Sequence, residues 1–180
     1  MELTHKNLCD LAVRWLQRPN SRNGHGCCFA VSEVATGYAG EIPDAIGFRA
    51  SEWDCAGSVL VEVKTSRSDF LADKKKAHRI EGGVGDWRYY MAPTGLIQID
   101  ELPPQWGLVE VNGRGHINVV HGPAKVAKNF MSYRSQLEEF KHDANKSREF
   151  FLLVKLLTRL GNPEELNQRL RKFYRDVNSI

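Results

Sequence analysis

The sequence motif that decides the fold is the pair of segments Glu41-Ile42-Pro43-Asp44 and Val61-Glu62-Val63-Lys64. The second segment closes the run 58–65, SVLVEVKT, which is rich in β-branched residues and alternates as a strand does. Because successive side chains of a strand point to opposite faces, Glu62 and Lys64 should share one face. Asp44 opens a second apolar run that can pair with the first. The two segments therefore predict adjacent strands that bring two carboxylates and one ammonium group to one patch of a sheet.

Paired carboxylates beside a lysine point to a particular chemistry. Carboxylate oxygens are the ligands that hard divalent cations prefer, and an amine next to such a cation is placed to assist hydrolysis of a phosphodiester. The alternative interpretation is an ordinary solvated strand face, since the pattern hydrophobic-Glu-hydrophobic-Lys occurs in many strands. The motif taken alone leaves both interpretations open.

The residues that follow the motif extend it into a family resemblance. The order Pro-Asp and then Glu-x-Lys resembles the PD-(D/E)XK nuclease superfamily. The segment 62–75, EVKTSRSDFLADKK, is similar to the pattern E-(I/V)-K-(S/T)-S-x-x-D-F-x-x-D-x-K of its MmcB-like DNA-repair branch. The later segments 88–93, RYYMAP, and 102–109, from Leu-Pro to Gly-Leu-Val, match the same branch. The likeness covers residues 27–112 and leaves the C-terminal third of the chain outside it.

The resemblance implies a fold, an activity and a set of site residues. The fold would be α/β, a restriction-endonuclease-like αβββαβ core with a mixed sheet flanked by helices, followed by a C-terminal helical extension. The activity would be hydrolysis of DNA phosphodiester bonds with Mg²⁺ or Mn²⁺, in DNA repair, recombination or mobile-element processing. Asp44, Glu62 and the Val63 carbonyl would bind the metal, and Asp44, Glu62 and Lys64 would form the catalytic set.

The role of Lys64 and the identity of a further acidic residue stay open at this stage. Lys64 would position or deprotonate the attacking water, or stabilise charge that develops on the phosphoryl group. Glu33, near the end of the first predicted strand, is a candidate to support the metal, and Glu41 is its rival. A solvated side chain is an equal alternative for both glutamates. Asp73 lies in the family-like pattern, but the sequence suggests no chemistry for it.

A basic cluster follows the motif directly. Its positive charges could neutralise phosphates beside the active site, although a run of charges is often only a solvated helix face. The net charge of +3, from 25 basic and 22 acidic residues, is too small to decide between the two. The residues expected to contact nucleic acid are Ser66, Lys74, Lys75, Lys76 and Arg79.

The remaining sequence indicates how these segments are organised. A helix is expected over Leu3–Gln17, and a helix capped by Ser66 should continue to near Gly82. Strands are expected at Cys27–Val34, Asp44–Arg49, Ser58–Thr65 and Trp87–Ala92, and a hairpin at Gly107–Val111 and His116–His121. From about residue 124 onward the pattern is helical, with a new helix beginning at Asn162. We therefore expect a nuclease-like core over 1–123 and a helical extension over 124–180, together forming one domain.

Length and composition limit the alternatives. At 180 residues the chain is long enough to bury a core. It has no apolar run of membrane-spanning length and no charged-then-apolar leader, so we expect a cytoplasmic protein without membrane contact. The spacing of His25, Cys27, Cys28 and Cys55 does not favour a zinc site or a disulfide, so reduced, partly buried cysteines are expected.

Two further functions compete with a DNA-cutting enzyme. The first is a catalytically silent nuclease-fold module that binds nucleic acid or a protein partner. The second, weaker alternative is a toxin-like or anti-defence protein. The sequence does not distinguish DNA from RNA as the partner, and the apolar stripes of the C-terminal helices also leave a homodimer open.

Overall fold

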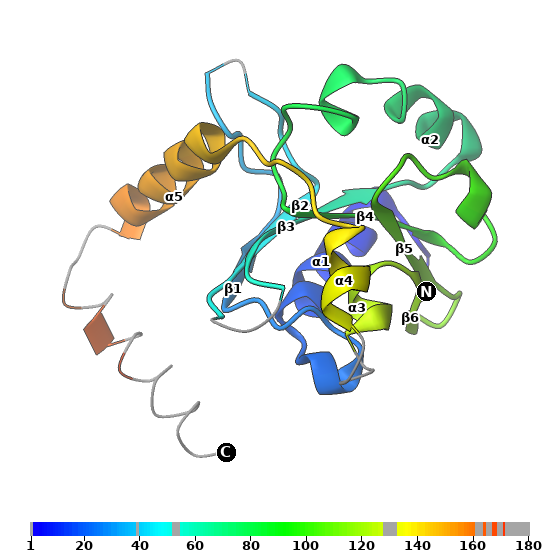
Figure 1. Ribbon diagram of the computed structural model, residues 1–180, viewed down its shortest axis with the longest axis horizontal. Coiled ribbons are helices and arrows are strands. Elements are labelled where there is room, and N and C mark those ends of the chain that lie inside the picture. Colours follow the sequence, from blue (N-terminus) through cyan, green and yellow to red (C-terminus); the bar gives the residue numbers. More distant parts are fainter. Residues whose placement is uncertain are drawn as a thin grey trace.

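The structure is a computed structural model that describes residues 2–38, 40–51, 55–127 and 133–160, together with residues 164, 167, 168 and 171. These residues form an α/β fold in which one mixed sheet is flanked by helices (Figure 1). The elements follow the order αβββαβ, after which come two further strands and the C-terminal helices. The predicted α/β class, with a mixed sheet between helices, is therefore confirmed.

The sheet contains six strands that lie in sequence order. The first three pair antiparallel, β3 to β5 pair parallel, and β5 and β6 form an antiparallel hairpin. A parallel neighbour requires a crossover connection, and α2 lies in the connection between β3 and β4. The strands are β1 (Phe29–Val31), β2 (Ala45–Arg49), β3 (Gly57–Val63), β4 (Trp87–Pro93), β5 (Trp106–Val111) and β6 (Ile117–His121).

Helices cover both faces of this sheet. α1 (His5–Gln17), α3 (Pro123–Val126) and α4 (Tyr133–Glu138) share a core with the odd-numbered residues of β3. α2 (Arg67–Asp73) and α5 (Lys146–Leu160) contribute to a second core, which contains Leu60 on the other face of β3. In Figure 1, α2 lies at the upper right, whereas α1, α3 and α4 are gathered near the centre of the view, apart from α2. The alternation of β3 therefore directs Glu62, like Leu60, toward the face that carries α2.

The amphipathic pattern of α1 explains how this helix begins and what it buries. The Thr4 hydroxyl caps the first turn by accepting a hydrogen bond from the backbone N–H of Asn7. Leu8, Trp15 and other apolar residues at helical spacing lie inward on the sheet. The N-terminal part of α1 lies next to the start of β2, so His5 and Cys9 are close to Asp44.

The helix after β3 is shorter than the sequence predicts. The sequence predicts a helix from Ser66 to near Gly82, whereas α2 ends at Asp73 and is followed by a turn and the short 3₁₀ helix Ala77–Arg79. On a continuous α-helix, side chains six residues apart are rotated by about 240°, so Asp73 and Arg79 would point apart. Ending the helix after Asp73 lets Arg79 turn back and bind it.

Two strands also differ from their predicted bounds. The first strand is Phe29–Val31 rather than Cys27–Val34, and β3 ends at Val63, one residue before Lys64. The hairpin of β5 and β6 is present, with an irregular register between Leu108 and Val109.

Buried polar contacts attach the N-terminus of α5 to the sheet. The Glu149 carboxylate is buried and accepts hydrogen bonds from the Ser58 hydroxyl at 2.5 Å and the Gly85 N–H at 2.9 Å. Lys146 Nζ lies 3.0 Å from the same carboxylate and 2.6 Å from that of Asp86. These contacts attach the first turn of α5 to the sheet.

Further along, α5 exposes an apolar stripe of Phe150, Val154 and Leu157. The helix expected to begin at Asn162 falls largely outside the described residues. Among the residues that the structure describes, none of the helices combines the length and apolarity that crossing a membrane requires.

Candidate active site

The predicted catalytic residues converge at the ends of β2 and β3. Ala45 lies opposite Val61 in the antiparallel register, so Asp44, the residue before β2, lies next to Glu62 near the end of β3. Lys64 Nζ lies 3.6 Å from Glu62 Oε2 and 3.9 Å from Asp44 Oδ2. Asp44 Oδ2 also accepts a 2.7 Å hydrogen bond from the Val63 N–H, which holds its carboxylate against the end of β3. The structure therefore brings together the four residues that the motif singled out.

Burial gives this group unusual electrostatics. Glu62 and Lys64 are 3% and 4% exposed, although both are ionisable. Loss of hydration raises the pKa of Glu62 above its usual range, while Arg79 and Lys64 favour its charged form. Glu62 Oε1 is buried and has no hydrogen-bond partner among the described residues. A buried acceptor without a partner is costly, so this oxygen is suited to a ligand or ion that supplies positive charge.

Asp73 is a member of the site that sequence reasoning missed. It is 1% exposed, and its carboxylate lies 3.6 Å from Lys64 Nζ and 2.7 Å from Lys76 Nζ. The Tyr90 hydroxyl donates to it at 3.1 Å. Burial acts to raise the pKa of Asp73, but its hydrogen bonds and charge contacts with Arg79 outweigh burial and lower that pKa. Asp73 is therefore a charged counter-ion that holds Lys64 in place.

The structure places Arg79 differently from the prediction. Instead of a surface phosphate contact, it is a buried side chain, 4% exposed, whose guanidinium binds the acidic cluster. Two of its nitrogens contact the Asp73 carboxylate at 2.8 and 3.0 Å, and Nη2 lies 2.6 Å from Glu62 Oε2. The nearby carboxylates raise the pKa of Arg79 against the opposing effect of burial. Charge attraction to three acids, including Glu41 at 3.4 Å, explains its inward position.

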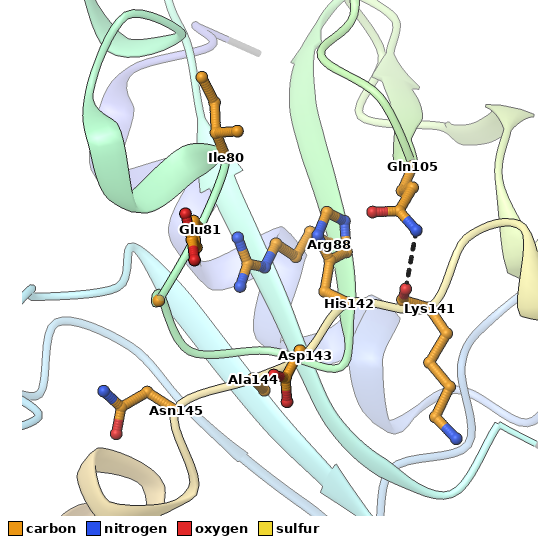
Figure 2. A pocket seen from close by; sticks show the side chains of 10 residues that line it. Ile80, Glu81, Arg88, Gln105, Lys141, His142, Asp143, Ala144 and Asn145 are labelled. Atoms are coloured by element: carbon orange, nitrogen blue, oxygen red, sulfur yellow. Dashed lines mark hydrogen bonds between the residues drawn. The ribbon is translucent and has the colours of Figure 1, made fainter.

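A second buried arginine, Arg88 in β4, supports the loop that carries Arg79. Its guanidinium donates to the carbonyl oxygens of His78, Gly83 and Gly85 at 3.0–3.1 Å. Figure 2 shows Arg88 extending toward Glu81 in a cavity of about 570 Å³ between this loop and the linker before α5. Since its donors are used by the loop backbone, Arg88 acts here as a support for the loop.

The two rival glutamates have different surroundings. Glu41 faces inward: its carboxylate accepts a 2.8 Å hydrogen bond from the Val84 N–H and pairs with Arg79. Glu33 is exposed and has a positive φ of 54°, and its N–H donates to the Pro43 carbonyl at 3.1 Å. Glu41 thus supports the charge network through Arg79, whereas Glu33 remains near Asp44 at the surface.

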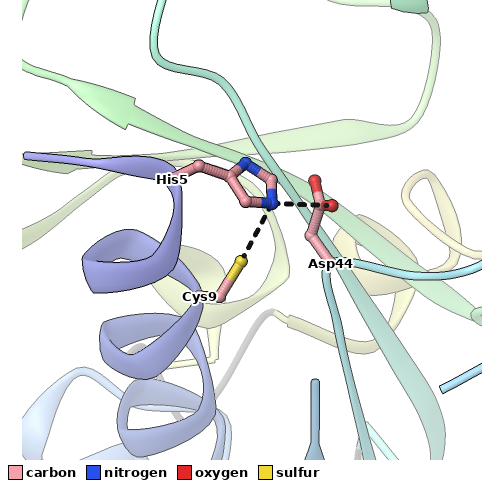
Figure 3. A group of neighbouring side chains, drawn as sticks. All are labelled: His5, Cys9 and Asp44. Atoms are coloured by element: carbon pink, nitrogen blue, oxygen red, sulfur yellow. Dashed lines mark hydrogen bonds and ion pairs between the residues drawn. The ribbon is translucent and has the colours of Figure 1, made fainter. Parts of the chain in front are cut away.

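The second oxygen of Asp44 faces α1. As Figure 3 shows, His5 Nε2 lies between Asp44 Oδ1, at 3.5 Å, and Cys9 Sγ, at 3.4 Å. Burial and then the charge of Asp44 raise the pKa of the Cys9 thiol to about 12. The sequence prediction did not include His5 and Cys9. Their spacing of four residues on a helix was the available signal, because it places both side chains on one face.

The remaining predicted nucleic-acid contacts lie around α2. Ser66 caps this helix by accepting from the Asp69 N–H at 3.3 Å. Lys75 is exposed, and Lys74 is half-buried, with its ammonium over the Phe70 ring. Lys76 is half-exposed but bound to Asp73. Lys75 is therefore the most accessible cation of the basic cluster.

The cysteines outside the site agree with the prediction in part. Cys27 is buried and its neighbour Cys28 is exposed, but both residues precede β1, so strand alternation does not explain the difference. His25 is buried edge-on against Trp15 and Tyr89, so it belongs to the aromatic core.

Comparison with known proteins adds a fold relative. No protein-family model matches this chain, and no curated protein sequence matches it. A solved structure, the SPO1766 protein of unknown function from Silicibacter pomeroyi, superimposes with a TM-score of 0.55. The match covers 95% of this chain and 94% of that one, at 19% sequence identity. At this identity the likeness shows a shared fold.

Proposed function

We propose that this protein is a metal-dependent nuclease that hydrolyses phosphodiester bonds of DNA. The observation that carries the proposal is the convergence of Asp44, Glu62 and Lys64 at the ends of two paired strands, with Lys64 Nζ within 3.9 Å of both carboxylates. The likeness of residues 27–112 to the PD-(D/E)XK superfamily supports it. A role in DNA repair, recombination or mobile-element processing follows from the same likeness, and the sequence composition suggests that this role is carried out in the cytoplasm.

The residues present fit a hard divalent cation. Glu62 Oε1 is a buried oxygen without a hydrogen-bond partner among the described residues, and Asp44 supplies a second carboxylate. With the Val63 carbonyl, these groups offer the oxygen ligands that Mg²⁺ and Mn²⁺ accept. Such an ion, when bound, would polarise the scissile phosphate as a Lewis acid.

The protein side chains have separate tasks in the proposed reaction. A water oxygen forms a bond to phosphorus as the water gives a proton to solvent, and the bond from phosphorus to the leaving sugar oxygen breaks as that oxygen takes up a proton from solvent to become a hydroxyl group. The Lys64 ammonium donates a hydrogen bond toward the charge that develops on the phosphoryl oxygens. Asp73 holds this ammonium in place from 3.6 Å. Since Lys64 is buried, its charge acts in a site with little screening by water.

One observation favours a second function, a nuclease-fold module that binds nucleic acid or a protein without cutting. Arg79 Nη2 lies 2.6 Å from Glu62 Oε2 and so provides the buried carboxylate with a positive partner. In a non-catalytic module this ion pair would stabilise the site without any metal. For a nuclease, Arg79 would have to share Glu62 with the cation.

A nuclease assay distinguishes the two functions. The purified protein is incubated with linear, circular, single-stranded and branched DNA, and with RNA, each in Mg²⁺, Mn²⁺ or EDTA. The nuclease proposal predicts cleavage of at least one DNA form that requires a divalent ion and stops in EDTA. Binding to DNA without cleavage under every condition would establish the non-catalytic module instead.

The basic cluster makes a separate prediction about DNA affinity. Replacing Lys74 and Lys75 by alanine should weaken duplex binding and reduce the slope of log K against log salt concentration by roughly 0.9 for each lost phosphate contact. Fluorescence anisotropy between low and moderate salt measures this slope. Lys125→Ala is the matched control, because Lys125 is an exposed lysine on α3, away from α2. Equal slopes in all three proteins would show that the segment directly after α2 is only a solvated face.

A further inference from the structure

A mixed set of potential metal ligands lies on the α1 side of Asp44. His5 and Cys9 come from the first turns of α1, and Asp44 comes from the residue before β2. One ligand atom from each, an imidazole nitrogen, a sulfur and a carboxylate oxygen, lies within 4.8 Å of the other two (Figure 3). Among the described residues, this is the group of histidine, cysteine and acidic side chains that meets this spacing.

The separations match those of ligands around one tetrahedral ion. Zinc bonds of about 2.3 Å to sulfur and 2.0–2.2 Å to nitrogen and oxygen place tetrahedral ligand atoms about 3.4–3.6 Å apart. Here Cys9 Sγ lies 3.4 Å and Asp44 Oδ1 3.5 Å from His5 Nε2. The third distance, between Cys9 Sγ and the Asp44 carboxylate oxygen, is at most 4.8 Å, and it is the only one of the three that would have to shorten. Closing that gap requires a shift of the Cys9 or the Asp44 side chain.

The chemistry of the three groups selects the ion. Thiolate and imidazole favour zinc-like ions, whereas Mg²⁺ takes oxygen ligands. Cys9 is buried, and the side chain of His5 is 47% exposed, so the cluster is closed on the protein side and open toward solvent. Three protein ligands with one open position are typical of zinc sites that bind water or a substrate.

We propose that His5, Cys9 and Asp44 form a Zn²⁺ site distinct from the hydrolytic Mg²⁺ or Mn²⁺ site. The two sites meet at Asp44, whose Oδ1 faces His5 and whose Oδ2 faces Val63 and Lys64. The proposal of zinc binding depends only on this geometry. Bound Zn²⁺ would also orient the carboxylate that is shared with the hydrolytic metal, and this second statement rests on the proposed function.

Cobalt substitution tests the site without an activity assay. Co²⁺ is titrated into the reduced, metal-free protein, and the sulfur-to-cobalt charge-transfer absorption is recorded, which an all-oxygen site does not produce. The expected result is one equivalent of bound Co²⁺ with this absorption, which Zn²⁺ then removes by displacement. Cys9→Ala should lose the absorption, whereas Cys28→Ala, which removes an exposed cysteine of the same chain, should keep it.

Two further variants separate this site from the nuclease proposal. His5→Ala changes a largely exposed side chain and should weaken Co²⁺ binding by more than the ~10–100-fold that loss of an outer partner costs. Glu62→Ala should keep the absorption, because Glu62 is not a ligand of this site. The absence of sulfur-to-cobalt absorption in the wild type, its persistence in Cys9→Ala, or an unchanged Co²⁺ affinity in His5→Ala would overturn the proposal and leave a hydrogen-bonded cluster. Neither result depends on whether the protein cuts DNA.

Discussion

Lys64→Ala should reduce the rate of DNA cleavage by ~10²–10³, the usual loss when one electrostatic donor is removed from a centre where charge develops. Metal affinity should change little, because an ammonium group has no lone pair to give to a cation. The measurements are single-turnover cleavage with Mn²⁺ and calorimetric titration of Mn²⁺ into each variant. Glu62→Ala provides the contrast, since it should lose metal binding and cleavage together.

The burial of Lys64 requires a folding control. Three carboxylates surround its ammonium within 3.9 Å, so its removal leaves like charges close together. Lys64→Gln keeps most of the side chain without the charge, and thermal unfolding of both variants reports whether they remain folded. A folded Lys64 variant that cuts as fast as the wild type would remove Lys64 from the mechanism, while leaving the nuclease class intact.

Asp73→Ala should lower the free energy of unfolding by about 3–5 kcal/mol, the usual cost of breaking a buried ion pair by removing one partner. Without Asp73, the buried Arg79 guanidinium loses the carboxylate that binds two of its nitrogens, and the Lys64 ammonium loses one of its acidic neighbours. Urea unfolding followed by circular dichroism measures the effect. Asp69→Ala is the matched control, because Asp69 is an exposed aspartate in the first turn of the same helix, where a charge contributes about 0.3–1 kcal/mol. Equal midpoints for the two variants would contradict the counter-ion role of Asp73.

The acid sensitivity of the fold follows from the same residue. The pKa of Asp73 is lowered in the folded protein, so its contribution to stability is complete above the unfolded value of about 3.9. That contribution is lost as the pH falls from this value through the lower folded pKa. The wild type should therefore lose stability more steeply than Asp73→Asn on acidification below about pH 4.

The catalytic candidates could be predicted from the sequence because their arrangement depends on local rules. Strand alternation places Glu62 and Lys64 two residues apart on one side, and the proline before Asp44 marks the start of the neighbouring strand. The register that sets Ala45 opposite Val61 is then favoured by the matching apolar patterns of the two strands. Asp44, Glu62 and Lys64 could therefore be singled out together, and the α/β class with them.

The role of Arg79 was not predictable in the same way. A run of basic residues after a helix start is typical of a solvated face, and a continuous helix would have kept Arg79 away from Asp73. The buried carboxylates of Glu62, Asp73 and Glu41, from three separate segments, attract the guanidinium and so favour an interrupted helix. Arg88 then holds the resulting loop through its carbonyl oxygens. The sequence prediction considered only the local run of charge, so it did not anticipate that Arg79 is buried against three acids.

The sequence by itself determined which residues alternate along a strand and which segments form the central strands. It also determined that two acids and a lysine meet where β2 begins and β3 ends. Backbone periodicity and apolar patterning act over short distances, so the sequence carries this information. Only the tertiary structure decided which charges pair inside the site. Asp73 with Arg79, and Asp44 with His5 beside Cys9, are contacts between separate elements, set by how α1, α2 and the loop after α2 pack around the sheet. In a buried site with little screening, those non-local pairs determine the charge that each group carries.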